Sequence, residues 1–158
     1  MQTLDQTEDS LFQEPAHKAQ VLVFTSGKAS VGKTSIVANV AVSLTKKGAK
    51  VCVIDASIGY DNINMVLDIQ PEYTFEQVLT GNKSVAEIIN TSATGVSVVS
   101  GVASLVTATN LGEIERRNFL TALADIETAY DYVLIDIPAG VTENLLQVIE
   151  SAPYAFMV

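Results

Sequence analysis

Short apolar runs alternate with longer amphipathic stretches along most of this chain. The run VLVFT follows Gln20 and predicts a buried strand, because a continuous apolar run suits the interior of a parallel sheet. A helical pattern comes next, in which apolar residues recur at the spacing i, i+3, i+4 and i+7: Val37, Val40, Ala41 and Leu44. A basic last turn and Gly48 then predict where this helix ends.

The strand and helix patterns recur further along the chain. Four more apolar runs predict strands: KVCVID, which ends at Asp55, then Val96–Ser100, then YVLID, which ends at Asp136, and finally YAFMV. Between residues 62 and 90 we expect short helices, with Thr74 and Ser84 as N-caps and Glu87 completing a capping box with Ser84. A long helix is expected over Glu113–Tyr130 and a last one over Asn144–Ile149. The apolar stripe of the long helix is predicted to comprise Ile114, Leu120, Leu123, Ala124 and Ile126.

Strands that alternate with helices predict an α/β protein, with a mostly parallel β-sheet flanked by helices and right-handed crossovers. The 158 residues suit a single core. Residues 1–18 are acidic and polar and lack a sustained apolar period, so we expect a flexible tail there. Residues 19–158 are then one domain.

Composition and charge narrow the class of protein. Hydrophobic residues make up 48% of the chain and charged residues 17%, which indicates a folded globular protein. The net charge of -9 disfavours binding to nucleic acid. The lysines Lys46, Lys47 and Lys50 could still form a small basic binding face, although such a cluster more commonly marks a solvated helix end. The beginning of the chain has no secretory pattern and no run is long enough to cross a bilayer, so we expect a cytoplasmic protein. The single cysteine, Cys52, is expected in the core.

The strongest chemical signal lies between the first strand and the first helix. The pattern G-x-x-x-x-G-K-[ST], which is typical of phosphate-binding P-loops, is matched in full by Gly27, Lys28, Ala29, Ser30, Val31, Gly32, Lys33 and Thr34. Backbone amides of this loop and of the helix start, including Ser35, would point at one anion. Lys33 would neutralise phosphate oxygens and Thr34 would offer its hydroxyl to Mg²⁺. We therefore predict a P-loop domain that binds ATP with magnesium.

Two aspartates close apolar strands at the same expected edge of the sheet. Open α/β sheets bind ligands at the carboxyl ends of their strands, so Asp55 and Asp136 are predicted metal ligands and Asp55 a predicted catalytic residue. Either one could instead simply mark where its strand meets water. After Asp136, the turn IPAG places Gly140 where its amide would approach a terminal phosphate. Gly59 would have a similar role in the loop that follows Asp55.

These motifs together resemble those of the MinD/ParA family of deviant Walker A ATPases. The resemblance is carried by Lys28 within GKASVGKT, by IDASIG at Asp55 and by IDIPAG at Asp136. Within that family, GYDNINMVLDIQPEYTFEQVLTGNKSVAEII and GVSVVSG resemble the FlhG/FleN regulators of flagellar number, over residues from about 20 to 158. The resemblance implies an ATP-dependent homodimer in which Lys28 and Lys33 are catalytic and Lys28 touches the nucleotide of the partner subunit. It also implies an FlhF-like GTPase or other flagellar regulators as partners, and Asp5, Gln6 and Thr7 faintly resemble the tail element for that GTPase, although a chance dipeptide in an acidic tail is the commoner meaning.

The chain departs from the family pattern at three places. Ala29 and Ser30 stand where the family loop has two glycines, and any position there that needs a positive φ is penalised. Ser57 replaces an aspartate that helps to place the attacking water, so we expect slow hydrolysis. The chain also stops after YAFMV, whereas family members continue with an adenine-recognition loop and a basic membrane-binding helix. We therefore expect this C-terminally truncated chain not to bind membranes alone, and its last strand to leave an exposed sheet edge.

The function that the resemblance implies is an ATP-dependent regulatory switch, and other functions are possible. Ala29, Ser30 and Ser57 favour a non-hydrolysing module, in which the bound nucleotide only stabilises a shape that binds a partner. A small-molecule kinase or amidoligase would use the same loop but would need a substrate pocket with charged residues of its own. The second half of the chain shows no such set, because after Lys83 the only basic residues are Arg116 and Arg117. A nitrogenase-type iron protein is excluded because one cysteine cannot hold an iron-sulfur cluster.

Overall fold

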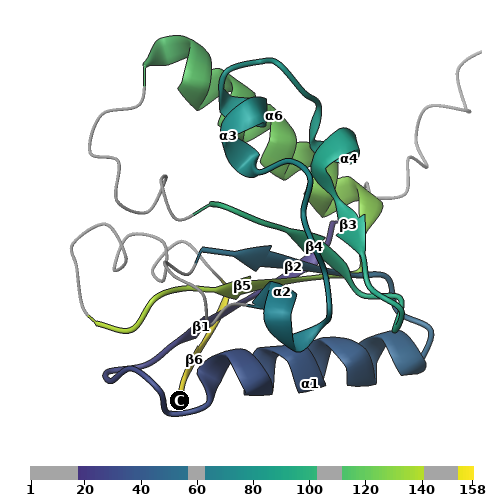
Figure 1. Ribbon diagram of the computed structural model, residues 1–158, viewed down its shortest axis with the longest axis vertical. Helices are drawn as coiled ribbons and strands as arrows, with labels where there is room; N and C mark the ends of the chain where they lie inside the picture. The colour runs from purple at the N-terminus through teal and green to yellow at the C-terminus, as the bar shows by residue number, and fades with distance from the viewer. Residues whose placement is uncertain (1–17, 57–62, 103–111, 141–152) are drawn as a thin grey trace, which may run out of the picture.

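The computed structural model describes residues 18–56, 63–102, 112–140 and 153–158. Their strands form one six-stranded sheet in the order β3-β4-β2-β5-β1-β6 (Figure 1). The strands are β1 (Gln20–Thr25), β2 (Val51–Asp55), β3 (Asn90–Thr91), β4 (Ser97–Val99), β5 (Tyr132–Asp136) and β6 (Tyr154–Met157). All neighbouring strands run parallel except β3, which pairs antiparallel with β4. The predicted α/β fold with a mostly parallel sheet is confirmed.

Helices cover both faces of this sheet. The helices are α1 (Lys33–Lys46), α2 (Ile63–Val66), α3 (Phe75–Leu79), α4 (Val85–Ile88) and α6 (Glu113–Ala129). Helix α1 lies along one face, and α3, α4 and α6 lie over the other (Figure 1). The two faces have separate cores because successive side chains of a strand point to opposite sides.

The core on the α1 side confirms the predicted helix stripe. Val37 and Ala41 are buried, and Val40 and Leu44 pack at the margin of the same cluster. The helix ends as predicted, since Gly48 adopts φ 92°, a backbone conformation that favours glycine. The strand side chains in the same cluster include Phe24, Val51, Val53, Val98 and Leu134.

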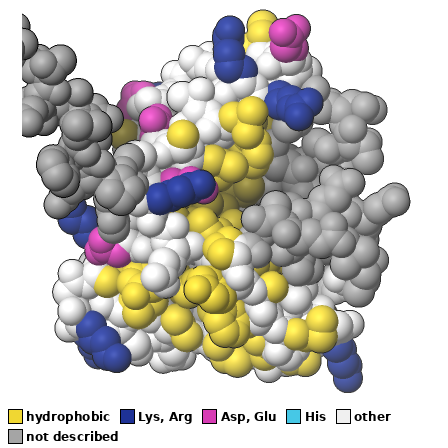
Figure 2. Space-filling view, turned by 180° about the vertical axis from the view of Figure 1, so that it is seen from behind, with side chains coloured by type: hydrophobic (Ala, Val, Ile, Leu, Met, Phe, Trp, Pro, Cys, Tyr) yellow, Lys and Arg dark blue, Asp and Glu magenta, His cyan; other side chains and the backbone are white. Residues whose placement is uncertain are grey.

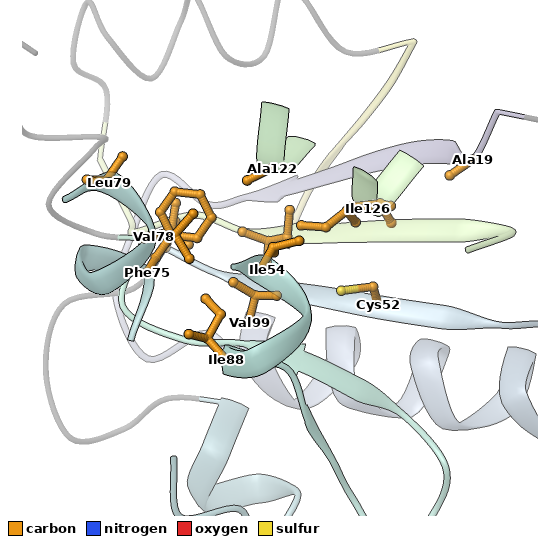
Figure 3. Close-up of a cluster of buried hydrophobic side chains, with 14 of the residues drawn as sticks. Ala19, Cys52, Ile54, Phe75, Val78, Leu79, Ile88, Val99, Ala122 and Ile126 are labelled. Carbon is orange, nitrogen blue, oxygen red and sulfur yellow. The ribbon is translucent and has the colours of Figure 1, made fainter. Parts of the chain in front are cut away.

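The core on the α6 side joins three helices to the sheet (Figure 3). Phe75 of α3 lies edge-on to Phe119 of α6, with 5.9 Å between ring centroids. Cys52 is fully buried there, and burial raises the pKa of its thiol to about 12, so the thiol stays protonated as a small apolar group.

The predicted apolar stripe of the long helix is partly wrong. Ile126 is buried and Leu123 packs at the margin of the core, but Ile114 and Leu120 are 64% and 56% exposed, and Ala124 is also exposed. The face that meets the sheet instead runs through Phe119, Ala122 and Ile126. The predicted stripe included Ile114, Leu120 and Ala124 and left out Ala122, a small residue that is buried in the core.

The short helices begin at the predicted caps. Glu87 accepts hydrogen bonds from the backbone amide and the hydroxyl of Ser84 at 2.8 and 3.0 Å. These bonds, together with the Lys83 ammonium, lower the pKa of Glu87 to about 2. Gln77 bonds the amide of Thr74 in the same way, at 2.9 Å.

Other predicted elements shift or fall outside the described residues. The strand expected over Val96–Ser100 is the shorter β4, and its antiparallel neighbour β3 has too few residues to give a period-two signal. Residues 1–17 of the expected tail and the expected helix at Asn144–Ile149 lie outside the described residues. The last predicted strand is confirmed as β6, which pairs with β1 and is outermost among the described strands. None of the helices in the described part is both long and apolar enough to cross a membrane.

Candidate nucleotide-binding site

The predicted phosphate loop joins the carboxyl end of β1 to the start of α1. Residues 27–32 are exposed, and the loop closes at Gly32, which adopts φ 90° next to the first residue of α1. Helix α1 has 14 residues, so the backbone amides of its first turn provide a field that favours an anion. The loop therefore leads into an open, positively polarised helix start.

Two side chains of the first helical turn converge on one buried carboxylate. The Lys33 ammonium forms an ion pair with Asp136, which ends β5. The Thr34 hydroxyl donates to the other oxygen of the same carboxylate at 2.7 Å. Lys33 is only 8% exposed and Asp136 is fully buried. A buried charge is stable only when it is paired, so this contact holds both side chains in place.

The second predicted aspartate lies beside the first. Asp55 and Asp136 are register partners on the adjacent parallel strands β2 and β5, so their side chains point to the same face of the sheet, the α1 face. Asp55 is 2% exposed. The carbonyl of Asp136 accepts the amide of Ala56 at 3.0 Å, which ties the two strand ends together. The prediction that both aspartates reach one edge of the sheet is confirmed.

The oxygen groups at this edge suit a magnesium ion whose coordination shell is completed by phosphate oxygens. Mg²⁺ in nucleotide sites is held by one or two carboxylates, a hydroxyl, waters and phosphate oxygens. Asp136, Asp55 and Thr34 supply the protein's share of such a set. Among the residues that the structure describes, no group of three or more histidine, cysteine and acidic side chains could hold a metal by itself. The metal roles of Thr34, Asp55 and Asp136 remain predictions.

The start of the loop contains a polar group that sequence patterns did not single out. Ser26 is 2% exposed, and its Oγ is the one buried side-chain oxygen in the described ranges without a hydrogen-bond partner. Its carbonyl accepts the amide of Gly140 at 3.1 Å. An unpaired buried hydroxyl beside a phosphate loop fits a site that a polar ligand completes.

The Gly140 amide is already used within the protein. Gly140 adopts φ 113°, as expected for a tight turn, but its amide donates to Ser26 rather than pointing freely into the loop. A contact between this amide and a phosphate requires that hydrogen bond to break. The predicted role of Gly140 therefore needs a rearrangement of the turn after β5.

The remaining loop residues lie at the surface of the protein. Lys28, Ala29, Val31 and Ser35 are exposed, and Val31 leaves 43% of its surface open. Ser57 and Gly59 lie outside the described residues, so their predicted roles stay predictions. The direct pairing of Lys33 with Asp136 had no sequence signal, because 103 residues separate the two.

One departure from the family loop has a visible backbone cost. Ser30 adopts φ 62°, in the left-handed region that favours glycine, while Ala29 does not have a positive φ. A side chain at such a position costs roughly 1–2 kcal/mol. The expected penalty thus falls on Ser30 alone.

A parallel α/β sheet with this loop after its first strand, a lysine and threonine opening the next helix, and aspartates at strand ends defines a P-loop nucleotide-binding fold. Comparison with protein families agrees. The family described as "AAA domain" matches residues 19–152. The chain belongs to this family, and its relatives are of the MinD/ParA kind.

Two curated relatives place the chain more closely. The antiactivator FleN of Pseudomonas aeruginosa is 26% identical over 142 residues, which cover 90% of this chain and 51% of FleN. The septum site-determining protein MinD of Thermotoga maritima is 32% identical over 140 residues, which cover 87% of this chain and 51% of that protein. The chain thus spans about half the length of these relatives.

Solved structures share the same fold. MinD of Aquifex aeolicus superposes with a TM-score of 0.69 at 28% identity, over 88% of this chain and 56% of that one. Cobyrinic acid a,c-diamide synthase of Mycobacterium smegmatis, solved with an ATP analogue and magnesium, superposes with a TM-score of 0.70 at 21% identity, over 88% and 59%. At that identity the second likeness concerns the fold alone.

The conformation of the loop predicts opposite effects for two neighbouring glycine substitutions. Ser30→Gly removes the side chain from a residue whose backbone is left-handed, which relieves strain, but it also gives the unfolded chain more freedom. The net effect should be a rise of about 0.5 kcal/mol in the free energy of unfolding. Ala29→Gly is the matched control and should lower it by about 0.5–1 kcal/mol, since it adds only that freedom. Urea denaturation measures both. Equal losses of stability in the two variants would contradict the assigned loop conformation.

Proposed function

We propose that this chain is an ATP-binding switch of the MinD/ParA kind, which binds ATP with Mg²⁺ at residues 27–34, dimerises in that state and hydrolyses ATP slowly. The observation that carries the proposal is the convergence of Lys33 and Thr34 on the buried carboxylate of Asp136. These are the groups that a bound magnesium nucleotide would rearrange.

The exchange of partners upon binding follows from charge. A triphosphate needs the Lys33 ammonium, but taking that ammonium away leaves Asp136 as a buried carboxylate without its ion pair. Mg²⁺ would supply the replacement charge, and Asp136 and the Thr34 hydroxyl are the protein groups that would hold it. Nucleotide and metal would therefore enter as one unit, with Asp55 as a further ligand or as a group that orients the attacking water.

Dimerisation rests on the position of Lys28. This lysine is exposed on the loop, whereas Lys33 is buried in its ion pair, so the two lysines of the motif have different surroundings. An exposed cation beside a phosphate site can contact the nucleotide of a facing subunit. In this arrangement Lys33 binds the phosphates of its own subunit and Lys28 those of the partner.

Slow turnover rests on the loop backbone and on Ser57. The Ser30 side chain occupies a left-handed position next to the proposed phosphate site, and a misplacement of about 1 Å can lower a rate about a hundredfold. Serine at position 57 is a poor base at neutral pH. A second candidate, a nucleotide-binding module without hydrolysis, is favoured by the same residues.

The finer biological role is drawn from the relative named as an antiactivator, FleN. We place this chain in the control of flagellar number or position, with an FlhF-like GTPase or a flagellar regulator as a partner. Such a role needs only a surface that changes with nucleotide, which dimerisation across the loop provides.

The role of Lys28 can be measured by sedimentation velocity with and without ATP and Mg²⁺. The native chain should shift from monomer toward dimer with nucleotide, and Lys28→Ala should stay monomeric while it still binds nucleotide. Lys47→Ala, an exposed lysine at the far end of α1, is the control and should behave like the native chain. Nucleotide-dependent dimers of Lys28→Ala would refute the cross-subunit contact.

Turnover distinguishes the two candidate functions. Phosphate release by the native chain should be slow but above background, and Ser57→Asp should accelerate it by at least about tenfold, since a positioned carboxylate supports proton transfer. If neither the native chain nor Ser57→Asp released phosphate, the result would support the non-hydrolysing module. Fast release by the native chain would eliminate that module and contradict the predicted slow hydrolysis.

A further inference from the structure

The hydroxyl of Ser26 is buried without a hydrogen-bond partner, and in the described part of the chain no other buried side-chain nitrogen or oxygen is left in this state. Ser26 is 2% exposed, so bulk water does not reach it. On the face shown in Figure 2, by contrast, charged side chains stand at the surface, where water satisfies them. An unpaired buried hydroxyl costs free energy, and such a group in a folded protein calls for a reason.

A second buried serine at the same edge of the sheet shows that burial alone does not leave a hydroxyl unpaired. Ser100 follows β4 as Ser26 follows β1, and it is 3% exposed. Its hydroxyl donates to the side-chain oxygen of Asn64 at 2.9 Å. The two serines therefore have the same burial and opposite pairing, which makes Ser100 a matched reference for Ser26.

The backbone of Ser26 is tied to the turn that follows β5. The Ile137 amide donates to the Phe24 carbonyl at 3.2 Å, and the Gly140 amide donates to the Ser26 carbonyl at 3.1 Å. Gly140 adopts φ 113°, and a Cβ added to it would meet no heavy atom within 4 Å. The turn therefore has room beside Gly140, and the bond to the Ser26 carbonyl is what holds this amide in place.

Transfer of the Gly140 amide to a terminal phosphate would change the surroundings of both polar groups of Ser26. The Ser26 carbonyl would lose its donor, and the space that the amide filled would open. A water molecule that entered this space would donate to the carbonyl and accept from the hydroxyl, because water can do both. The hydroxyl that has no partner in the free protein would then be paired.

We propose that Ser26 is a specificity-determining residue, which makes the site prefer a nucleoside triphosphate to the diphosphate. This inference rests on the proposed ATP-binding function. With a diphosphate bound, the Gly140 amide stays on the Ser26 carbonyl and the hydroxyl stays unpaired. With a triphosphate bound, the amide moves to the terminal phosphate, and the carbonyl and hydroxyl of Ser26 share one water molecule. The hydroxyl thus favours the triphosphate state over the other two.

The size of the preference follows from the cost of the unpaired hydroxyl. An unpaired buried polar group disfavours the state that contains it by roughly five- to a hundredfold in an equilibrium constant. Ser26→Ala removes this cost from the free protein and from the diphosphate complex alike, so the diphosphate affinity does not change. In the triphosphate complex the variant instead loses a hydrogen bond. Only the triphosphate affinity should therefore fall.

Calorimetric titration of the full chain with ADP and with a non-hydrolysable ATP analogue, both with Mg²⁺, tests the proposal. Ser26→Ala should bind the analogue at least about fivefold more weakly and ADP as the native chain does. In urea without nucleotide, the unfolding midpoint of Ser26→Ala should rise. Ser100→Ala, the control, breaks a formed hydrogen bond, so its midpoint should fall while the ratio of the two affinities stays native.

Two results would overturn the inference alone: a native affinity ratio in Ser26→Ala, or a fall in its unfolding midpoint as large as that of Ser100→Ala. A native chain that bound neither nucleotide would overturn the proposed function and this inference with it. The two failures are therefore distinguishable.

The exchange of the Gly140 amide can also be followed directly by NMR, without any substitution at Ser26. The measurement is made on Lys28→Ala, which is expected to bind nucleotide as a monomer, so that dimerisation does not shift the signals. The Gly140 amide signal should shift with the ATP analogue and not with ADP. Gly112, whose amide donates to Glu115 at 2.9 Å at the start of α6, is the reference and should shift with neither. A Gly140 signal that responds to both nucleotides alike would overturn the exchange.

Discussion

The buried ion pair between Lys33 and Asp136 is the constraint on which the proposed site depends. It joins the first turn of α1 to the end of β5, and the Thr34 hydroxyl adds a second bond to the same carboxylate. A buried carboxylate must keep a cationic partner. Any ligand that takes the lysine must therefore bring a cation of its own, and this requirement links nucleotide to magnesium in one binding step.

The strand order explains why these groups meet. The central strands β2, β5 and β1 lie side by side and run parallel, so their carboxyl ends present Asp55, Asp136 and the phosphate loop at one edge. Helix α1 then returns along the face to which both aspartates point. The same order places β1, which leads into the phosphate loop, between β5 and β6.

Much of this arrangement could be predicted from the sequence, because the signals were local. The loop motif, the strands ending in aspartate and the capping residues Thr74 and Ser84 are each read within a few positions. The predicted apolar stripe of α6 was partly wrong because it depends on packing. The buried face of this helix includes the small residue Ala122, whereas the large residues Ile114 and Leu120 are exposed. The pairing of Lys33 with Asp136, the bond from Gly140 to Ser26 and the left-handed backbone of Ser30 arise only when distant segments meet, so no local pattern shows them.

Calorimetric titration with ATP, in the presence of magnesium and again with a chelator, tests the linked exchange most directly. Saturable binding at one site per chain is expected with magnesium. Without magnesium the affinity should be weaker by at least about tenfold, because the nucleotide would then leave Asp136 buried and unpaired. Equal affinity with and without magnesium would contradict the exchange. The absence of any heat from a well-folded sample at millimolar nucleotide would contradict the site itself.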